Sequence, residues 1–405
     1  MLTVEEALEL ILGEIRPMGL ERAELLSALG RVAGEDIRAE RPNPPWDNSA
    51  MDGYALRAGD TAGACEESPA VLEVAGDVPA GSVFRGELAE GQAVRIMTGA
   101  PLPAGANAVV MVEHTERMGE REVAVKRPVR TGENVRRRGE DFAEGDVVVP
   151  AGTVLTSRHV SMLATVGRPY VSVFQRPRVA VLSTGDELVE IDEPLGEGKI
   201  SNSNGYTLTA QVIECGCLPV NLGIARDRKD SLEEKLRAAA SADCIISSGG
   251  VSVGDYDLVK DVLAELGSEM KFWKVAMKPG KPLAFGTIGG RPAFGLPGNP
   301  VSSFMAFEQF VRPALLKMSG HAALSRRTVR ARLTRDVKKK RGRTNFLRAV
   351  VSYGEDGYAA TPLEGQGSGM ISTMVKANAL VVVPSDAESL EAGSLVDVQM
   401  LDGGS

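Results

Sequence analysis

The chain has 405 residues, of which 43% are hydrophobic and 25% charged, and its formal net charge is -8. At roughly 150 residues per domain this length predicts about three domains. The negative charge argues against nucleic acid as a partner, because a phosphate backbone calls for a broad basic face. Four cysteines fit a reducing compartment better than a disulfide scaffold, and three histidines argue against a Cys/His metal site. The N-terminus lacks the basic region of a signal peptide and no apolar run is long enough for a bilayer, so we expect a cytoplasmic protein without membrane contact.

The first part of the chain predicts one helix and a small β domain. Thr3 and Glu6 can form a capping box, and residues 4–15 place apolar side chains on one helix face. After the proline-rich stretch PPWDNSAMDGYAL (44–56), short β-type runs alternate with Gly and Pro turns up to about residue 140. A helical pattern returns in SRHVSMLATVG (157–167).

From about residue 176, predicted strands alternate with predicted helices, including one helix over 256–267. RVAVLS (178–183), DCIIS (243–247) and PAFGL (292–296) have the composition of buried strands. This alternation predicts parallel βαβ units in a doubly wound sheet. A long helix is expected over 300–318, and after about residue 322 the chain becomes β-rich again, which predicts a compact C-terminal β domain.

The loops that follow three of these strands have unusual sequences, namely TGDEL (184–188), SGGVSVGDYD (248–257) and PGNPVSSF (297–304). Because ligands bind beyond the carboxyl ends of parallel strands, we expect these loops to line one crevice. The glycines allow backbone N–H groups to approach a phosphate closely. Pro300 at the start of a helix, with Ser302 in its first turn, is also typical of an anion site.

Charged residues complement these loops. The stretch FWKVAMKPGKPLAFG (272–286) places three lysines among apolar residues, and we interpret them as facing an anionic ligand. Carboxylates beside a phosphate indicate a bridging hard cation such as Mg²⁺, and the acidic residues expected at the same edge are Asp186, Glu187, Asp227 and Asp257. The simpler alternatives are a tight turn for the glycines, a helix cap for one acid and solvation for a lysine. For Arg136, Arg137 and Arg138 the simpler alternative is surface ion pairs with Glu140 and Asp141.

Nine motifs in one order resemble the molybdopterin molybdenumtransferase family, known as MoeA in bacteria and as the E domain of gephyrin in animals. They are NSAMDGYA, GDVPAG, IMTGAPLPAGANAVV, VRRRGEDF, LSTGDEL, KISNSNGY, SSGGVSVGDYD, MKPGKPLAFG and GLPGNPVSS. The resemblance covers nearly the whole chain.

The resemblance implies an α/β plus β fold in an elongated, multi-domain chain. Its central part would be a doubly wound, parallel-sheet molybdopterin-binding domain like that of MogA, and its C-terminal part a β-barrel-like domain. The implied domains are a discontinuous N-terminal dimerisation domain (1–41 and 140–172), an inserted β domain (42–139), the α/β domain (173–322) and the C-terminal β domain (323–405). The implied assembly is a homodimer with composite active sites, and the resemblance also makes a molybdopterin adenylyltransferase a candidate partner.

The implied activity is a Mg²⁺-dependent transferase that uses molybdate and adenylylated molybdopterin, cleaves the phosphoanhydride and releases AMP. Matched to the family motifs, the catalytic candidates are Asp52, Thr98, Glu187, Asp227, Asp257, Lys274, Lys278 and Lys281. The substrate-binding candidates are Arg136, Asp141, Thr184, Gly185, Ser248, Gly249, Gly250, Pro297, Pro300, Ser302, Arg348 and Ser368. The metal candidates are Asp186, Glu187, Asp227 and Asp257.

Two other functions compete with this interpretation. Molybdopterin adenylyltransferases resemble only the region 176–322, so the additional N- and C-terminal domains favour metal insertion over adenylylation. A non-catalytic scaffold is the second alternative, and the intact acidic and lysine positions argue against it.

Overall fold

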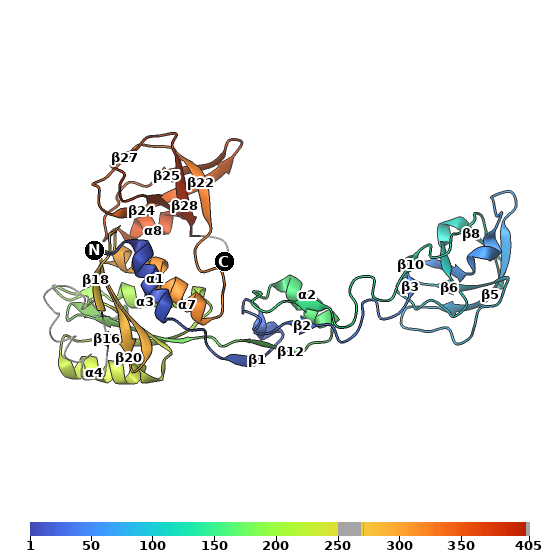
Figure 1. The fold of residues 1–405 in the computed structure, drawn as a ribbon, viewed down its shortest axis with the longest axis horizontal. Coiled ribbons are helices and arrows are strands. Elements are labelled where there is room, and N and C mark those ends of the chain that lie inside the picture. Colours follow the sequence, from blue (N-terminus) through green and yellow to red (C-terminus); the bar gives the residue numbers. More distant parts are fainter. Residues whose placement is uncertain (250–268, 270, 402–405) are drawn as a thin grey trace. The chain divides into compact units, whose positions relative to one another are not determined.

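The computed structural model describes residues 1–249, 269 and 271–401 (Figure 1). The chain divides into two compact units. The first comprises Met1–Glu35, Gly152–Val160 and Tyr170–Ser405, and the second comprises Asp36–Ala151 and Ser161–Pro169. Every helix within the described ranges is too short or too polar to cross a lipid bilayer.

The second unit contains the predicted small β domain. Its six-stranded sheet has the order β7-β4-β6-β5-β9-β8. The strands are β4 (Gly53–Leu56), β5 (Ala70–Val78), β6 (Gln92–Ile96), β7 (Ala108–Met111), β8 (Thr115–Met118) and β9 (Glu122–Val125). Two short antiparallel pairs accompany the sheet: β3 (Asn48–Ser49) with β10 (Val135–Arg136), and β2 (Ile37–Arg38) with β11 (Val147–Val149). The helical turns η2 (Ala58–Thr61) and η3 (Val112–His114) connect strands of this domain.

In the first unit, two segments that are distant in the sequence pair with each other. β1 (Leu20–Glu24) runs antiparallel to β12 (Tyr170–Phe174). The helices on either side in the sequence are α1 (Val4–Glu14), which has the predicted Thr3–Glu6 capping box, η1 (Leu26–Ala28) and α2 (Ser157–Thr165), whose residues from Ser161 onward belong to the second unit. The apolar face of α1 lies in the core of the α/β domain, where Ala7 and Ile11 are fully buried with Phe307 and Phe310.

The α/β domain is built on a mixed six-stranded sheet with the order β16-β13-β17-β21-β20-β18. Four strands are parallel, as predicted: β13 (Arg178–Thr184), β16 (Leu218–Ala225), β17 (Cys244–Ser248) and β21 (Arg291–Leu296). The sequence interpretation was incomplete at the other edge, because β20 (Pro282–Ile288) and β18 (Lys271–Lys274) run antiparallel. The hairpin turn at Gly289 and Gly290, both with positive φ, allows β21 to fold back directly on β20.

Helices cover both faces of this sheet because its side chains alternate. Val179 and Val181 point into a core shared with α1, α3 (Ser203–Glu214) and the helices that follow β21. Ala180 and Leu182 face the opposite core, which is closed by α4 (Lys229–Ala238) and η4 (Ala239–Ser241). The predicted helix over 256–267 lies outside the described residues.

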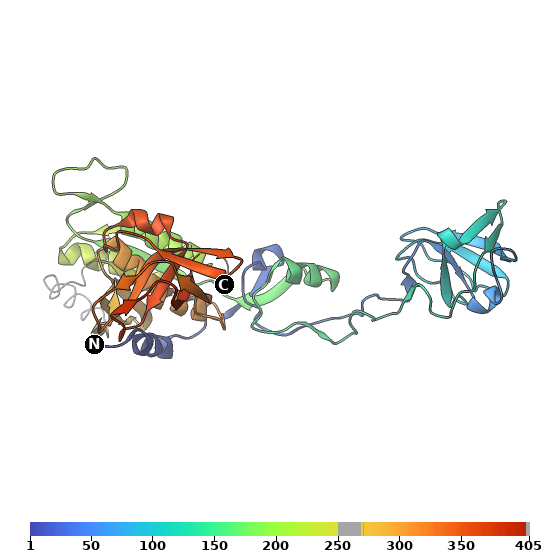
Figure 2. The ribbon, with the colours of Figure 1, turned by 90° about the horizontal axis from the view of Figure 1, so that it is seen from above.

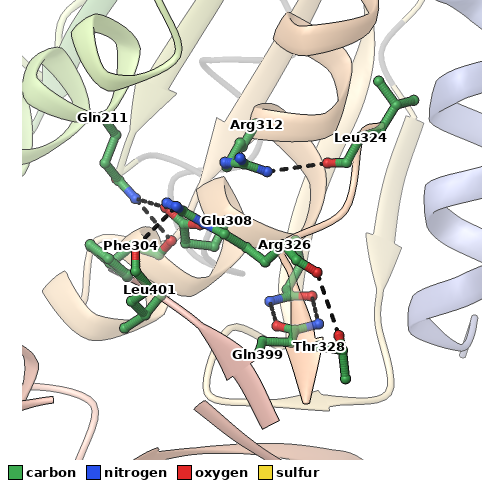
Figure 3. A network of polar contacts seen from close by, with 10 residues as sticks. Gln211, Phe304, Glu308, Arg312, Leu324, Arg326, Thr328, Gln399 and Leu401 are labelled. Carbon is green, nitrogen blue, oxygen red and sulfur yellow. Dashed lines mark hydrogen bonds and ion pairs between the residues drawn. The ribbon is translucent and has the colours of Figure 1, made fainter. Parts of the chain in front are cut away.

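The long helix predicted over 300–318 is continuous but not α-helical throughout. It consists of α6 (Pro300–Ala306), the π-helical segment η5 (Phe307–Val311) and α7 (Arg312–Met318). Figure 3 shows that η5 carries a buried Glu308, whose carboxylate accepts hydrogen bonds from Arg326 Nε at 2.9 Å and from Gln211 Nε2 at 3.0 Å. A π-helical turn is an uncommon feature, and here it holds a charged side chain in the core.

The C-terminal domain is a closed five-stranded barrel, as expected for the predicted barrel-like fold. The barrel order is β24-β25-β22-β28-β26, and β26 pairs again with β24. Its strands are β22 (Thr328–Leu333), β24 (Thr344–Gly354), β25 (Gly357–Pro362), β26 (Ala379–Val383) and β28 (Leu395–Met400). The remaining elements are β23 (Val337–Lys338), β27 (Ser389–Leu390) and α8 (Ile371–Lys376). Figure 1 shows these strands, orange to red, above the green and yellow elements of the α/β domain, and in Figure 2, seen from above, they lie in front of those elements.

Candidate active site

The carboxyl ends of four parallel strands lie level with one another. Ser183 of β13 pairs with Ser248 of β17, and Ser248 pairs with Leu296 of β21. On the other side of β13, Thr184 pairs with Ala225 of β16. The loops after these strands therefore begin at one edge of the sheet. Between β13 and β17 the strand order reverses, and this is the position at which open α/β sheets bind ligands.

A cavity of about 70 Å³ lies at this reversal. Five of the predicted site residues line it: Thr184, Glu187, Ser248, Gly249 and Pro300. Gly298, next to the predicted Pro297, and further polar residues, among them Asn204, complete the lining. Pro297 itself contributes its carbonyl, which accepts a hydrogen bond from Ser248 Oγ at 3.4 Å. The cavity is thus formed by four segments from separate parts of the chain.

Gly249 brings two of these loops into contact. It has a φ of +92°, and a Cβ at this position would lie 2.5 Å from the carbonyl oxygen of Thr184. The Gly249 N–H donates to the Leu296 carbonyl at 3.1 Å. Glycine is therefore required here for both its conformation and its lack of a side chain. Gly250, the next predicted residue, lies outside the described residues.

Asn204, in the first turn of α3, connects the loops that follow β17 and β21. Its Nδ2 donates to Ser248 Oγ and to the Gly298 carbonyl, both at 2.8 Å. Three buried polar atoms at the cavity have no hydrogen-bond partner among the described residues: Asn204 Oδ1, Ser183 Oγ and Asn202 Nδ2. Buried polar atoms are normally paired, so this concentration of unpaired atoms indicates a polar ligand.

Two acidic residues of the predicted site are joined through their backbones. The Asp186 N–H donates to Asp227 Oδ2 and the Asp227 N–H donates to Asp186 Oδ1, both at 3.2 Å. Lys199 Nζ fixes the same turn by donating to the Asp186 carbonyl at 2.6 Å. Glu187 is exposed at the cavity, and a Cβ on Gly185 would overlap its carboxylate. Gly185 therefore leaves room for Glu187 to fold toward the strand ends.

The acidic residues fit Mg²⁺ in part. Carboxylate oxygens are the ligands that this cation prefers, and Asp186 and Asp227 offer two adjacent carboxylates. Within the part of the chain that the structure describes, no group of three or more His, Cys, Asp or Glu side chains is placed to hold a metal ion. Asp257, the further predicted ligand and catalytic residue, lies outside those residues. The four-residue metal set therefore stays a prediction.

The three predicted lysines lie along one segment that joins two domains. Lys274 ends the edge strand β18, where it pairs with Pro282. Lys278 lies on β19 (Met277–Lys278), which pairs with β24 of the C-terminal barrel through Asn345. All three lysine side chains, including that of Lys281, are exposed. The lysines are therefore accessible to a ligand at the junction of the sheet and the barrel.

A second cavity, of about 300 Å³, lies beside Lys278. Its lining is rich in basic side chains, with Arg335, Lys338 and Lys339 from the barrel facing the same space. Two acidic residues, Asp336 and Glu364, are also part of the lining, and Glu364 forms an ion pair with Arg335 at 3.3 Å. The remaining positive charge makes this cavity suitable for a small anion.

The start of α6 lies between the two cavities. Pro300 is the first residue of the helix, as predicted, and the Val301 N–H donates to the Ser368 carbonyl at 3.0 Å. Ser302 is only 6% exposed, and its carbonyl lies 3.2 Å from the position of a Cβ on Gly280 in the lysine segment. Ser302 thus lies beside the lysine segment and its neighbour Val301 contacts Ser368, although the Ser302 hydroxyl has little access from outside.

Arg348 of β24 is completely buried without a carboxylate partner among the described residues. Its Nε donates to Thr373 Oγ1 at 2.8 Å, and its Nη2 donates to the Gly365 and Gly367 carbonyls at 2.9 and 3.1 Å. Its Nη1 is buried without an acceptor in the same part of the chain, and burial lowers the pKa of the guanidinium. Arg348 therefore fixes the segment that leads to Ser368 through hydrogen bonds, and its Nη1 has no acceptor among the described residues.

The remaining predicted residues belong to the second unit. Asp52 Oδ1 accepts hydrogen bonds from the N–H and the hydroxyl of Thr98, both at 2.7 Å, and these bonds lower the pKa of Asp52. Arg136 lies on β10 opposite Asn48, and Asp141 accepts a hydrogen bond from Asn43 Nδ2 at 3.0 Å. Asp52 and Thr98 are thus hydrogen-bonded to each other. Arg136 lies on β10, and Asp141 follows it in the chain.

Part of the arginine cluster of the second unit forms surface ion pairs, as the simpler alternative predicted. Arg137 Nη1 pairs with Asp47 at 2.6 Å, although the expected partners were Glu140 and Asp141. The Glu140 carboxylate instead accepts a hydrogen bond from the Arg137 backbone N–H at 2.8 Å. No ion pair of Arg136 or Arg138 occurs within residues 1–249, 269 and 271–401.

Sequence reasoning missed several residues of the site. Asn204 lies in the motif KISNSNGY, which was recognised as a family feature but given no role. Its position four residues after Ile200, in the first turn of a helix that follows a short strand, was the available signal. Arg226, whose Nη1 donates to the Leu188 carbonyl at 2.8 Å, gave no comparable signal because its partner is a backbone atom.

The fold and these loops define a multi-domain protein with an α/β ligand-binding domain. Three protein-family profiles match the chain: the MoeA N-terminal region (domain I and II) over residues 2–167, a probable molybdopterin binding domain over residues 180–317, and the MoeA C-terminal region (domain IV) over residues 330–401.

Individual proteins match over nearly the full length. The chain is 39% identical to the molybdopterin molybdenumtransferase of Bacillus subtilis (strain 168), over 94% of this chain and 90% of that protein. It is 38% identical to the protein of the same name from Haemophilus influenzae, over 98% of both. A crystal structure of the molybdopterin biosynthesis MoeA protein from Pyrococcus horikoshii superposes with a TM-score of 0.86 at 36% identity and covers 100% of both chains. The chain therefore belongs to the MoeA family of molybdopterin molybdenumtransferases.

Proposed function

We propose that this protein is a transferase of molybdenum cofactor biosynthesis that inserts molybdenum from molybdate into adenylylated molybdopterin and releases AMP. This proposal rests on sequence identity to two molybdopterin molybdenumtransferases. The identity is 39% over 94% of the chain for one and 38% over 98% of the chain for the other. The polar cavity at the strand reversal supports it, because a pterin with a phosphate-bearing tail is rich in hydrogen-bonding groups.

The cavity between β13 and β17 is proposed to hold the molybdopterin part of the substrate. Gly249 and Gly298 leave backbone exposed where a phosphate can approach. Asn204 Oδ1 and Ser183 Oγ are available as hydrogen-bond partners. At about 70 Å³ the cavity accommodates only part of such a substrate, so the remainder would extend along the edge of the sheet.

The lysine segment is proposed to bind the anionic groups that react. Lys274, Lys278 and Lys281 would reduce the repulsion between molybdate, which is a dianion, and the phosphoanhydride. Their exposure permits this contact. Lys278 and Gln366 line the same cavity, and Arg348 holds the neighbouring Gly365 and Gly367 through hydrogen bonds, so the segment that leads to Ser368 lies near positive charge.

Asp186 and Asp227, together with Glu187 and Asp257, are proposed to hold Mg²⁺. When bound, the cation would supply charge neutralisation at the phosphate oxygens and polarise the anhydride. The residues of this chain orient the carboxylates: each of the two backbone N–H groups fixes the other residue's side chain, and Lys199 holds the turn. Glu187, which lies at the cavity, is the carboxylate best placed to receive or donate a proton there.

Asp52, Thr98, Arg136 and Asp141 are proposed to complete the site of the partner subunit in a homodimer. Their chemistry suits this role, because Asp52 and Thr98 form a preorganised polar pair on an exposed surface. A molybdopterin adenylyltransferase as supplier of the substrate also remains a prediction.

The test is an insertion assay with purified protein, adenylylated molybdopterin and molybdate. We expect AMP release and a product that reactivates a molybdenum-free molybdoenzyme. AMP formation that requires ATP and unmodified molybdopterin would instead establish an adenylyltransferase. A protein that catalyses neither reaction but still binds molybdopterin would support the scaffold alternative.

A further inference from the structure

A third cavity, of about 390 Å³, lies in the first unit away from the strand ends. It is formed by three parts of the chain: the segment 29–32 with Val154, the end of β12 with residues 175–176, and the C-terminal parts of α3 and α7 with the segment that follows them. None of the predicted site residues lines it. Its charged lining consists of Arg31, Arg176, Arg312, Arg326 and one carboxylate, Glu214.

Two of the four arginines form ion pairs and two do not, among the described residues. Arg31 forms an ion pair with Glu21, and Arg326 pairs with the buried Glu308 at 2.9 Å. In the part of the chain that the structure describes, no ion pair involves Arg176 or Arg312. Glu214, at the rim, is exposed and makes no ion pair with them in that same part. The cavity therefore carries a net positive charge.

Arg312, which Figure 3 shows near Arg326, is a buried arginine of this group. It is 6% exposed, and among the described residues its Nη1 donates a hydrogen bond to the Leu324 carbonyl at 3.2 Å. Burial and the neighbouring Arg326 lower the pKa of Arg312. A guanidinium offers five N–H donors, so most of its capacity remains unused.

Two further donors at the cavity are buried without a partner. Arg31, which is 9% exposed, and Arg176 each have a Nε–H with no acceptor among the described residues. The other titratable groups add no negative charge, because burial raises the pKa of the Cys215 thiol and burial with Arg312 lowers the pKa of His321. A site with excess positive charge and unused donors is costly unless an anion occupies it.

We propose that this cavity is a second ligand site, separate from the candidate active site, which binds a small organic anion carrying phosphate or carboxylate groups. Arginine suits both groups because its planar donors can contact two oxygens at once. The volume lies within the range of roughly 300–1,000 Å³ that small-molecule pockets occupy. Apolar side chains such as Leu29, Ile213 and Leu316 would cover the body of the ligand.

The test is isothermal titration calorimetry of the full chain with three probes: phenyl phosphate, citrate and inorganic phosphate. We expect one of the two organic probes to bind with one equivalent per chain and more tightly than inorganic phosphate, and the preferred probe identifies the group that is recognised. Arg176→Gln and Arg312→Gln should each weaken this binding by about tenfold or more, which corresponds to the loss of a charged hydrogen bond. Arg330→Gln, at an exposed arginine of the barrel, should leave it unchanged.

The variants distinguish this site from the active site. Molybdenum insertion by Arg176→Gln should remain within about twofold of wild type, because Arg176 is not among the residues that line the strand-end cavity. Arg312 is buried and its variant can misfold, so the half-buried Arg176 and a probe-soaked crystal provide independent evidence. The proposal is overturned if no organic probe binds, if binding is equal in Arg176→Gln and wild type, or if Arg176→Gln converts a dimer to a monomer without any anion binding.

Discussion

Asp186 and Asp227 each accept a hydrogen bond from the backbone N–H of the other, at 3.2 Å in both directions. This arrangement keeps two carboxylates adjacent at the end of the sheet, where their charges repel each other. Such a pair is favourable when a cation lies between or beside the carboxylates, and it gives the metal proposal its sharpest test.

We expect Asp227→Asn to reduce molybdenum insertion by about 10²-fold or more while the melting temperature changes little. Asparagine keeps the oxygen that accepts the Asp186 N–H but lacks the charge that attracts a cation. The measurement is the initial rate of AMP release as a function of Mg²⁺ concentration. Asp192→Asn, at an exposed carboxylate in the loop after β14 (Leu188–Val189), is the matched control and should retain full activity. Equal Mg²⁺ dependence in Asp227→Asn and wild type would remove Asp227 from the metal site.

Gly249→Ala should disrupt the strand-end cavity. A Cβ at Gly249 would lie 2.5 Å from the Thr184 carbonyl oxygen, so the loops after β13 and β17 would have to separate. Gly290→Ala is the control, because Gly290 also has a positive φ, of +77°, but nothing lies within 4 Å of its Cβ position.

Both glycine variants should lose about 1 kcal/mol of unfolding free energy from backbone strain. Only Gly249→Ala should also lose substrate affinity, which can be measured by titration with adenylylated molybdopterin. Equal affinity in the two variants would show that the contact between these loops does not form the binding site.

Arg348→Met tests whether the buried arginine serves the fold or the ligand. The substitution leaves the Gly365 and Gly367 carbonyls without their donor, so we expect a loss of about 2–4 kcal/mol in the free energy of unfolding. Denaturant unfolding of the variant and of the exposed control Arg330→Met would measure it. A variant as stable as wild type would mean that the buried charge costs as much as its hydrogen bonds contribute, and that arginine is retained for binding.

Thr98→Val should raise the pKa of Asp52. The Thr98 backbone N–H is the larger cause of the lowered pKa and remains in the variant, so the pKa should rise only part of the way to 3.8. Because the folded-state pKa is below the unfolded value, the stabilisation is present above pH 3.8 and is lost as the pH falls through the folded pKa. Carboxyl-carbon NMR titration of Asp52 measures the shift, and Asp60, in the same domain, is a reference group. An unchanged pKa in Thr98→Val would exclude the hydroxyl as a cause.

The parallel strands and the positions of the loops could be predicted because each depends on local sequence. Alternating strands and helices define the parallel order, and Pro300 marks the start of α6 at the residue expected. The direction of β18, which ends at Lys274, could not be predicted in the same way. It depends on β20, which pairs with β18 and is joined to β21 by a hairpin. Arg348 was expected as a ligand residue, but its complete burial depends on the segment 365–367, which is only brought to it by the barrel.

The sequence also could not predict which polar side chains are buried. Glu308 reads as one polar position in a helix, and its burial depends on Arg326, which lies beyond the end of α7, and on Gln211 from α3. The π-helical turn that carries it has no sequence signature of its own. Such groups are recognised only when the partner from a distant segment is in place.

The strand-end cavity is contributed by segments that begin at residues 183, 200, 248 and 298. No short fragment of the chain contains it, and it exists only after non-local strand pairing has occurred. A substrate that contacts all four segments would therefore stabilise the folded α/β domain. The resistance of this domain to proteolysis should increase when that substrate is bound.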